Sequence, residues 1–317
     1  MNKLSKIFAW HKETLVMTLL VKNEADIILD NILFHYSRGV DHIIVTDNGS
    51  TDDTVPILKR LQKDGYIELL EEEIYNQDKL VNKMGAIAKE KYGATILIHA
   101  DADEFWNPTK NGNLKKTFFK TGQPAVLVDR KDVLPTPECK SDEFPQKSQN
   151  IVTKHIVSNN IEKDSKKTSL FLFRLPPKVM FSVKDKLKKV GLGNHNLSEG
   201  NDPIVTKDII IFHFPFKSVH RFEEKVIMAG YVIKSVKTTP ETFWHWKRWY
   251  KEYENGRLDK EIDILIPDLK KISGVEYEPF DYSQRVLKPI KKNRKLWDYR
   301  ASQLKHIQGD LKSGVSK

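Results

Sequence analysis

Residues Ile96–Trp106 read ILIHADADEFW, an apolar run that ends in two aspartates one residue apart. Side chains at positions i and i+2 of an extended chain point to the same side, so Asp101 and Asp103 can converge on one ligand. Paired carboxylate oxygens suit Mg²⁺ or Mn²⁺, and these ions suit a phosphate-bearing substrate. An acidic turn that merely caps a strand is the alternative interpretation of such a pair.

The hundred residues that lead to this pair alternate between strand-like and helix-like patterns. Strands are expected at 15–21, 41–47, 66–71 and 94–100, and helices at 24–37, from about 51 to 63, and at 79–92. Gly39, Gly65 and Gly93 are expected to end the three helices. This alternation predicts right-handed crossovers and therefore an α/β fold with a mostly parallel sheet.

Three polar clusters are expected at one edge of that sheet. In open parallel sheets, ligands lie outside the carboxyl ends of the strands. Lys22-Asn23-Glu24 follows the first strand, Asp47-Asn48 follows the second, and Asp101 with Asp103 follows the fourth. The sequence therefore predicts a ligand site at this edge.

The pattern loosens after about Asn113. Strands are expected at 123–129 and 208–214, strand-like runs within 168–183, a Gly/Asn-rich loop at 191–201, and helices from 219 onward. We expect three consecutive segments: two halves of one domain at 1–113 and 114–235, and a helical, basic C-terminal extension at 236–317.

Composition narrows the class of protein. A chain of 317 residues with 39% hydrophobic residues can bury a sizeable core. Of the net charge of +10, residues 284–317 contribute about +8, from ten Lys/Arg and two Asp/Glu. This stretch can contact anionic lipid headgroups, an acidic polymer or nucleic acid, or it can simply be solvated.

The cysteine content and the apolar runs bear on the compartment. Cys139 is the single cysteine, which rules out an intrachain disulfide and a thiolate metal cluster and favours a reducing compartment. No apolar run has the length of a membrane span. Leu15–Val21 lacks a small-residue cleavage site and is followed at once by Lys22, so it is expected to be a strand and not a signal peptide.

Three other phosphate or metal motifs are excluded. The turn after the first strand contains no glycine, as a dinucleotide site would require. The chain has no phosphate-binding loop of the form GxxxxGK[ST]. A calcium loop that started at Asp101 would need Gly at its sixth position and Glu at its twelfth, where Trp106 and Gly112 stand.

Residues 15–107 resemble the nucleotide-sugar half of a family 2-like glycosyltransferase. The matching pieces are TLLVKNEAD, IIVTDNGSTDDT and ILIHADADEFW, and the later segments GLGNH (191–195) and IIFHFPFKS (210–218) also look like that branch. The resemblance implies the A-type (GT-A) fold, a Rossmann-like, mostly parallel sheet flanked by helices. In that fold, 1–113 would be the nucleotide-sugar-binding half of the domain and 114–235 its acceptor-binding and catalytic half. The resemblance also implies a nucleotide-diphospho sugar donor, a UDP-sugar first among them, and a glycan or glycolipid acceptor.

The resemblance implies roles for residues at the predicted edge. Asp47 would bind the base or ribose, or alternatively form an Asx turn with Asn48 and Gly49. Lys22, Asn23 and Glu24 would line the base pocket, although Glu24 can simply begin a helix. Asp101 and Asp103 would hold Mn²⁺ or Mg²⁺, with Asp103 as the more direct ligand. Residues expected to meet the diphosphate, or else to form a solvated helix face, are Lys79, Asn82 and Lys83.

A third metal ligand and a catalytic base are also needed. Glycosyltransferases of this fold often add a distant histidine, for which His195 and His213 are the candidates; a structural hydrogen bond is the alternative for each. An inverting transfer needs a carboxylate base. The candidates, each of which can also be a solvated loop charge, are Glu104, Asp142, Glu143, Glu199 and Asp202.

We therefore expect a metal-dependent glycosyltransferase of surface polysaccharide or lipopolysaccharide synthesis. The resemblance implies a cytoplasmic protein that works at the inner face of a membrane, with peripheral contact through the basic C-terminus; nucleic acid is not expected as a partner. The competing hypotheses are a metal-dependent nucleotidyltransferase and a non-catalytic protein that binds carbohydrate or nucleic acid. The aromatic stretch Phe243–Tyr253 is expected to be mainly a packing face.

Overall fold

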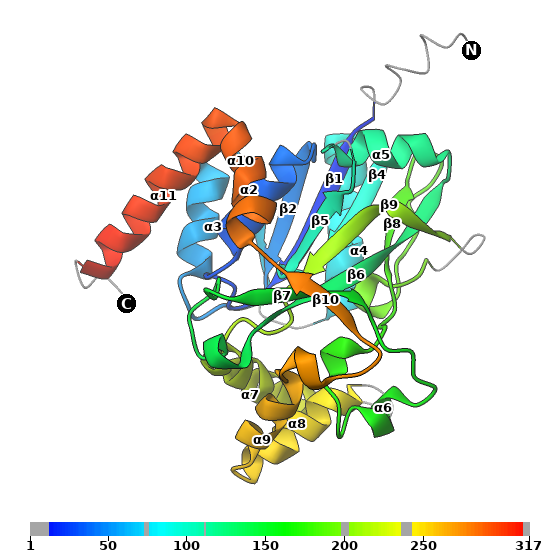
Figure 1. Ribbon diagram of the computed structural model, residues 1–317. Helices are drawn as coiled ribbons and strands as arrows, with labels where there is room; N and C mark the ends of the chain where they lie inside the picture. Colours follow the sequence, from blue (N-terminus) through cyan, green and yellow to red (C-terminus); the bar gives the residue numbers. More distant parts are fainter. Residues whose placement is uncertain (1–12, 73–75, 111, 198–202, 236–242, 313–317) are drawn as a thin grey trace. The chain divides into compact units, whose positions relative to one another are not determined.

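The computed structural model describes residues 13–72, 76–110, 112–197, 203–235 and 243–312 (Figure 1). The chain forms two compact units that interleave in sequence. Unit 1 comprises residues 1–130, 176–211 and 283–317, and unit 2 comprises 131–175 and 212–282. The sequence predicted three consecutive segments instead, because periodicity reports local structure and does not reveal which distant stretches pack together.

The first half of unit 1 follows the predicted order. Its elements are β1 (Leu15–Val21), α2 (Ile28–Ser37), β2 (His42–Asp47), α3 (Thr54–Lys63), β3 (Glu68–Glu71), α4 (Gln77–Tyr92) and β4 (Ile96–Ala100). Strands β4, β1, β2 and β3 pair in this order, and all three pairings are parallel. The predicted α/β class with a mostly parallel central sheet flanked by helices is confirmed.

The central strands of unit 1 are buried on both faces. Val16, Ile44 and Leu97 pack against apolar side chains of α4. Met17 and Ile98, which point to the opposite face because strand side chains alternate, have no exposed surface either. Such two-sided burial explains why these strands read as continuous apolar runs. Gly93, with φ at 60°, caps α4 in the left-handed conformation.

Antiparallel strands extend unit 1 beyond the predicted pattern. The elements after β4 are β5 (Glu104–Pro108), α5 (Leu114–Thr121), β6 (Ala125–Pro135), β8 (Lys178–Ser182) and β9 (Ile204–His213). Strand β8 pairs antiparallel with β4 and with the first part of β6. Strand β9 pairs with β5, a strand that the sequence did not predict.

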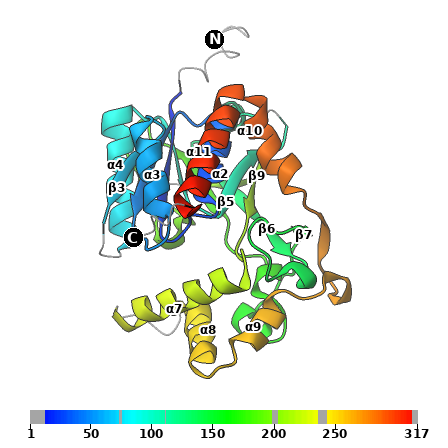
Figure 2. The ribbon, with the colours of Figure 1, turned by 90° about the vertical axis from the view of Figure 1, so that its left-hand side faces the viewer.

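The C-terminal helices also belong to unit 1. Helices α10 (Lys288–Lys292) and α11 (Arg294–Lys312) pack beside α2 (Figure 2). The guanidinium of Arg300 makes a two-pronged ion pair with the carboxylate of Asp30, in which Nη2 lies 3.0 Å from Oδ2. The basic stretch thus forms helices whose apolar residues Val286, Ile290 and Leu296 are buried, whereas most of its described cations are exposed.

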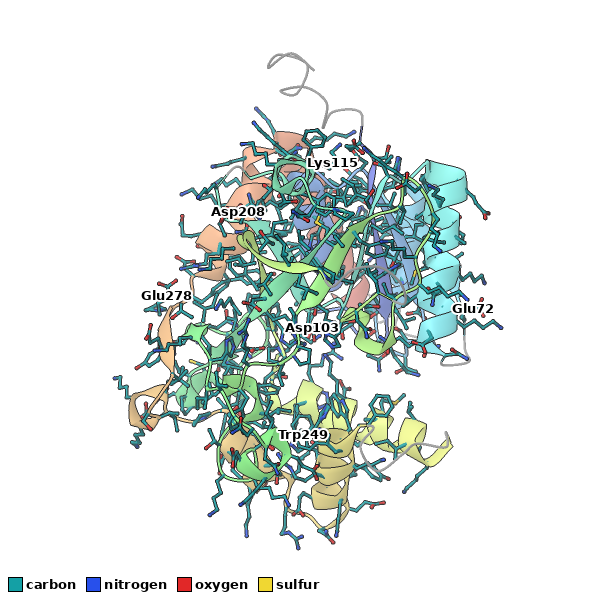
Figure 3. All side chains as sticks on the ribbon, turned by 90° about the vertical axis from the view of Figure 1, so that its right-hand side faces the viewer. Glu72, Asp103, Lys115, Asp208, Trp249 and Glu278 are labelled. Atoms are coloured by element: carbon teal, nitrogen blue, oxygen red, sulfur yellow. The ribbon has the colours of Figure 1, made fainter. Side chains whose placement is uncertain are left out.

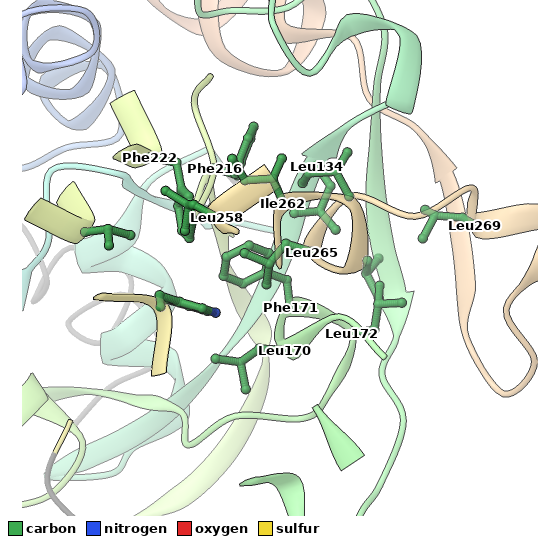
Figure 4. Close-up of a cluster of buried hydrophobic side chains, with 14 residues drawn as sticks. Leu134, Leu170, Phe171, Leu172, Phe216, Phe222, Leu258, Ile262, Leu265 and Leu269 are labelled. Carbon is green, nitrogen blue, oxygen red and sulfur yellow. The ribbon is translucent and has the colours of Figure 1, made fainter. Parts of the chain in front are cut away.

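Unit 2 has its own sheet and core. Its elements are β7 (Gln149–Lys154), α6 (Ile161–Asp164), α7 (Val219–Ser235), α8 (Trp244–Glu254), α9 (Leu258–Leu265) and β10 (Glu276–Pro279). Strand β7 pairs antiparallel with β10 and with the end of β6. Figure 4 shows the core, in which Phe171, Phe222 and Leu265 lie together.

The aromatic stretch Phe243–Tyr253 packs mainly into this core, as predicted. Trp249 is 2% exposed, and Trp244 and Trp246 are partly buried against the same cluster. Within the described residues, no helix combines the length and the apolar character needed to cross a membrane.

Candidate functional site

The carboxyl ends of the parallel strands of unit 1 bring the predicted polar clusters to one edge. Val21 pairs with Asp47 across β1 and β2, and Leu19 pairs with Ala100 across β1 and β4. The residues that follow these positions therefore leave the sheet side by side. Figure 3 shows Asp103 at this end of the strands and Lys115 at the opposite end, where β1 begins.

Asp47 shapes the loop after β2. Its Oδ2 accepts hydrogen bonds from the backbone N–H groups of Gly49 and Ser50, each over 3.0 Å, and its Oδ1 accepts the hydroxyl of Ser50. The residue is 3% exposed. These contacts are those of the Asx turn that the sequence left open as the alternative to nucleotide binding. The contact of Asp47 with a base or ribose stays a prediction.

The loops after β1 and β2 are joined by hydrogen bonds. The Asn23 side-chain oxygen accepts the backbone N–H of Thr51 over 2.7 Å, and the Asn23 backbone N–H donates to the Ser50 hydroxyl over 2.9 Å. Asn23 has φ at 55°, which turns the chain sharply after β1. Glu24 is buried, and its carbonyl accepts the N–H of Ile28 over 2.9 Å, so this residue lies in the turn just before α2.

Two polar residues of α2 hold the turn that carries the aspartate pair. The Asn31 amide donates to the carbonyls of Ala102 and Glu104, over 2.8 and 2.9 Å. Nε2 of His35 accepts the backbone N–H of Trp106 over 3.0 Å. Both side chains are fully buried. These roles were not among the predictions, although polar residues on the apolar face of a predicted helix indicate a structural role.

A buried lysine meets the aspartate pair, and the sequence analysis missed it. Lys178, the first residue of β8, places Nζ 2.7 Å from Oδ2 of Asp101 and 3.2 Å from Oε1 of Glu104. Burial would lower the pKa of Lys178, but the two carboxylates outweigh burial and raise it. Lys178 is therefore an ammonium. No local pattern could reveal it, because the antiparallel pairing of β4 and β8 joins distant parts of the chain.

Glu104 is a poor candidate for the catalytic base. Its side chain has no exposed surface, Oε1 faces the ammonium of Lys178, and Oε2 accepts the backbone N–H of Asp101 over 3.3 Å. A base must reach the acceptor hydroxyl. This expectation is corrected, because Glu104 is an internal partner of Lys178.

The Gly/Asn-rich loop fixes the orientation of His195. Gly193, with φ at 72°, lies so close to the imidazole that an added Cβ would come within 2.7 Å of Nε2. Nδ1 donates to the carbonyl of Pro177 over 2.9 Å, which makes Nε2 the ring acceptor. Burial, together with the charge of Lys178, lowers the pKa of His195 to about 4, although the bond to Pro177 opposes the shift. His195 is thus a neutral imidazole at pH 7.

His213 has a structural partner in unit 2. The carboxylate of Asp132 accepts Nδ1–H of His213 over 2.5 Å and Nε2–H of His155 over 2.8 Å. All three side chains are at most 10% exposed. Burial alone would raise the pKa of Asp132, but the hydrogen bonds from His155 and His213 lower it well below its usual range. His213 therefore makes a structural hydrogen bond, which was the alternative to metal binding that the sequence left open.

The remaining candidates lie on α4, in unit 2 or outside the described residues. Lys79 is exposed in the first turn of α4, and Lys83, also exposed on α4, pairs with Glu72. Glu143 is exposed and belongs to unit 2. Glu199 and Asp202 fall within 198–202, outside the described residues.

The part of the chain that the structure describes contains no preassembled metal centre. There, no group of three or more His, Cys, Asp or Glu side chains is arranged to hold a metal ion. The predicted set of Asp101, Asp103, His195 and His213 is therefore not assembled as a complete shell. The side chain of Asp101 is 43% exposed, and Asp103 is half-buried.

Comparisons with known proteins identify the type of enzyme. The model of glycosyltransferase family 92 matches residues 16–268. The finer placement predicted from the sequence, in a family 2-like branch, is not confirmed. No curated protein sequence matches the chain significantly.

Several solved glycosyltransferase structures resemble the chain at low similarity. Staphylococcus aureus TarS 1–349 in complex with UDP is 14% identical, with a TM-score of 0.40 over 91% of this chain and 92% of that one. The mannosyltransferase of Pyrobaculum calidifontis in complex with GDP-Man and Mn²⁺ is 15% identical, with a TM-score of 0.39 over 94% and 92%. Likeness at this level does not establish a shared substrate.

Proposed function

Because the chain belongs to glycosyltransferase family 92, we propose that it transfers a sugar from a nucleotide-diphospho sugar to a hydroxyl group of a glycan or glycolipid. The observation that carries the proposal is the edge of the parallel sheet in unit 1, where Asp101 and Asp103 follow β4 beside the loops of β1 and β2. Ligands of such sheets bind at this edge.

A divalent cation, Mn²⁺ or Mg²⁺, fits the aspartate pair. Mg²⁺ is commonly held by one or two carboxylates together with substrate phosphates, and not by a complete protein cage. The absence of a third preassembled ligand among the described residues agrees with an ion that arrives with the diphosphate. His195 is a candidate for a further ligand through Nε2. When bound, the ion would neutralise charge on the leaving nucleoside diphosphate.

The donor would lie over the loops after β1 and β2. Lys22, Asn23 and Glu24 would border the base, and Asp47 would act by holding the loop that shapes the pocket. Lys79 and Lys83, exposed on α4, would attract the diphosphate. A UDP-sugar is our first choice of donor.

The acceptor side of the site would supply the catalytic base. Glu143 and Glu199 remain the candidates for a base once Glu104 is set aside. We propose surface polysaccharide or lipopolysaccharide synthesis at the cytoplasmic face of a membrane as the setting. A run of exposed cations in α10 and at the start of α11 supports contact with anionic lipid headgroups. This run, which we call the basic corner, consists of Lys288, Lys291, Lys292, Arg294 and Lys295.

A thermal-shift screen tests the proposal. UDP-, GDP-, CMP- and dTDP-sugars are each added with and without Mn²⁺. We expect one nucleotide class to raise the melting temperature, and Mn²⁺ to increase that shift, since a ligand that binds only the folded state stabilises it. A protein that responds to no nucleotide and not to Mn²⁺ would contradict both the donor and the metal assignment.

A further inference from the structure

The ammonium of Lys178 closes a ring of contacts around the first aspartate of the pair. It lies 2.7 Å from Oδ2 of Asp101 and 3.2 Å from Oε1 of Glu104. The ring is completed by the backbone N–H of Asp101, which donates to Oε2 of Glu104 over 3.3 Å. The turn between β4 and β5 is therefore fixed by charges from both of its ends and from β8.

Burial makes this arrangement strong. The side chains of Lys178 and Glu104 are 2% and 0% exposed, so water screens their attraction little. A buried carboxylate such as Glu104 needs an opposite charge close by, because isolated burial of a charge is very unfavourable. Neutralising Glu104 would by itself explain why a lysine stands at position 178.

The contact with Asp101 goes beyond that neutralising role. Asp101 is 43% exposed, so water could solvate its carboxylate without help from a lysine. Lys178 nevertheless contacts Asp101 more closely than it contacts Glu104, since Nζ lies 2.7 Å from Oδ2 of Asp101 and 3.2 Å from Oε1 of Glu104. This contact selects one orientation of a side chain that would otherwise rotate.

We propose that Lys178 is a positioning residue of the donor site, which holds Asp101 in one orientation and offsets part of its negative charge. Asp103 then supplies the main contact with the metal ion, and Asp101 supplies a weaker, oriented second contact. The inference rests on the proposed function for the metal and the donor. The orientation of Asp101 by Lys178 can be tested separately from both.

Three variants separate positioning from simple charge neutralisation. Lys178→Met keeps the length of the side chain and removes its charge, Glu104→Gln removes the internal carboxylate, and the double variant removes both buried charges. Lys91→Met, which removes an exposed lysine paired with Glu68, is the matched control. Each variant is unfolded in urea and titrated with UDP, and separately with GDP, in the presence of Mn²⁺.

We expect Lys178→Met to lose both stability and nucleotide binding, because it removes the ammonium that neutralises the buried carboxylate of Glu104. The double variant should regain most of the stability but bind the nucleotide, in the presence of Mn²⁺, at least tenfold more weakly than the wild type. Lys91→Met should match the wild type in binding. Recovery of wild-type binding by the double variant would overturn the proposal, because neutralisation of Glu104 would then be the whole role of Lys178.

A crystal structure of the double variant gives a readout that needs no ligand. We expect the Asp101 carboxylate to leave its wild-type position or to occupy several. An unchanged Asp101 would overturn the positioning role even if the donor is never identified. Failure of the wild type to bind any nucleotide with Mn²⁺ would instead contradict the proposed function.

Discussion

Nε2 of His35 accepts the backbone N–H of Trp106 over 3.0 Å, and this contact fixes the protonation of a fully buried imidazole. Since Nε2 is an acceptor, Nδ1 carries the proton and donates to the carbonyl of Asn31 over 2.8 Å. Burial lowers the pKa of His35 to about 3. A neutral histidine on α2 thereby ties the segment after the aspartate pair to the body of unit 1.

Replacing Asn31 by leucine should loosen the aspartate turn. The substitution leaves the buried carbonyls of Ala102 and Glu104 without their donor, at a cost of roughly 1–3 kcal/mol each. We expect the free energy of unfolding to fall by about 2–6 kcal/mol in urea titrations at pH 7.5. Gln62→Leu, at an exposed position of α3, is the control and should change it by less than about 0.5 kcal/mol. Equal effects of the two substitutions would contradict this role of Asn31.

Acid should destabilise the protein through its buried histidines. Burial lowers the pKa of both His35 and His99 to about 3, from an ordinary value of 6.5. Between these values the unfolded chain binds protons that the folded chain does not. The free energy of unfolding should therefore fall as the pH drops from about 6.5 to about 3, by up to about 1.4 kcal/mol per pH unit for each histidine.

Urea titrations across this pH range test that slope. His99→Gln removes one of the two histidines and should make the dependence shallower. His306→Gln, at an exposed position of α11, should leave it unchanged. A His99→Gln profile parallel to that of the wild type would show that His99 does not titrate in this way.

Substitution of Asp132 by asparagine should weaken unit 2. The carboxylate accepts hydrogen bonds from two buried imidazoles, and an amide would present a donor to one of them. Breaking a buried charged network costs about 3–5 kcal/mol. We expect a loss of this size in the free energy of unfolding, whereas His220→Ala, at an exposed site, should have little effect. A change below about 1 kcal/mol would mean that the three side chains do not act as a network.

The basic corner should bind anionic vesicles. Each lysine near an anionic surface contributes about 1 kcal/mol, so the triple variant Lys291→Glu/Lys292→Glu/Lys295→Glu should lose at least about 3 kcal/mol, or more than a hundredfold in affinity. Sedimentation with vesicles of phosphatidylserine and phosphatidylcholine measures the loss. The control reverses three exposed lysines of unit 2, Lys163, Lys166 and Lys167. If both triple variants sediment alike, binding reflects net charge and not the basic corner.

Local sequence patterns were sufficient for the first half of unit 1. Strands buried on both faces produce apolar runs, and glycines end the helices between them, so the edge that carries Asp101 and Asp103 was predictable. The hydrogen bonds of Asp47 are also local, because they join it to Gly49 and Ser50. The Asx turn that they form was therefore predictable from the sequence as one of two alternatives. The assignment of nucleotide contacts to Asp47 came from resemblance alone.

Long-range pairing accounts for what was missed. Lys178 reaches Asp101 because β8 pairs antiparallel with β4, and no periodicity within either strand indicates the other. The interaction of His213 with Asp132 likewise joins residues 81 positions apart. A lone histidine at a strand end gives no hint of whether its partner is a metal ion or a carboxylate.

Because the two units interleave in sequence, unit 1 cannot complete its sheet until late in synthesis on the ribosome. Strand β4 ends at Ala100, but β8, which covers its free edge, begins only at Lys178. At about 5–20 residues per second, several seconds separate the synthesis of the two strands. Until then the nascent sheet presents an unpaired edge of apolar residues, a surface that invites association with other chains. We therefore expect unit 1 to depend on chaperones more than a domain that is continuous in sequence.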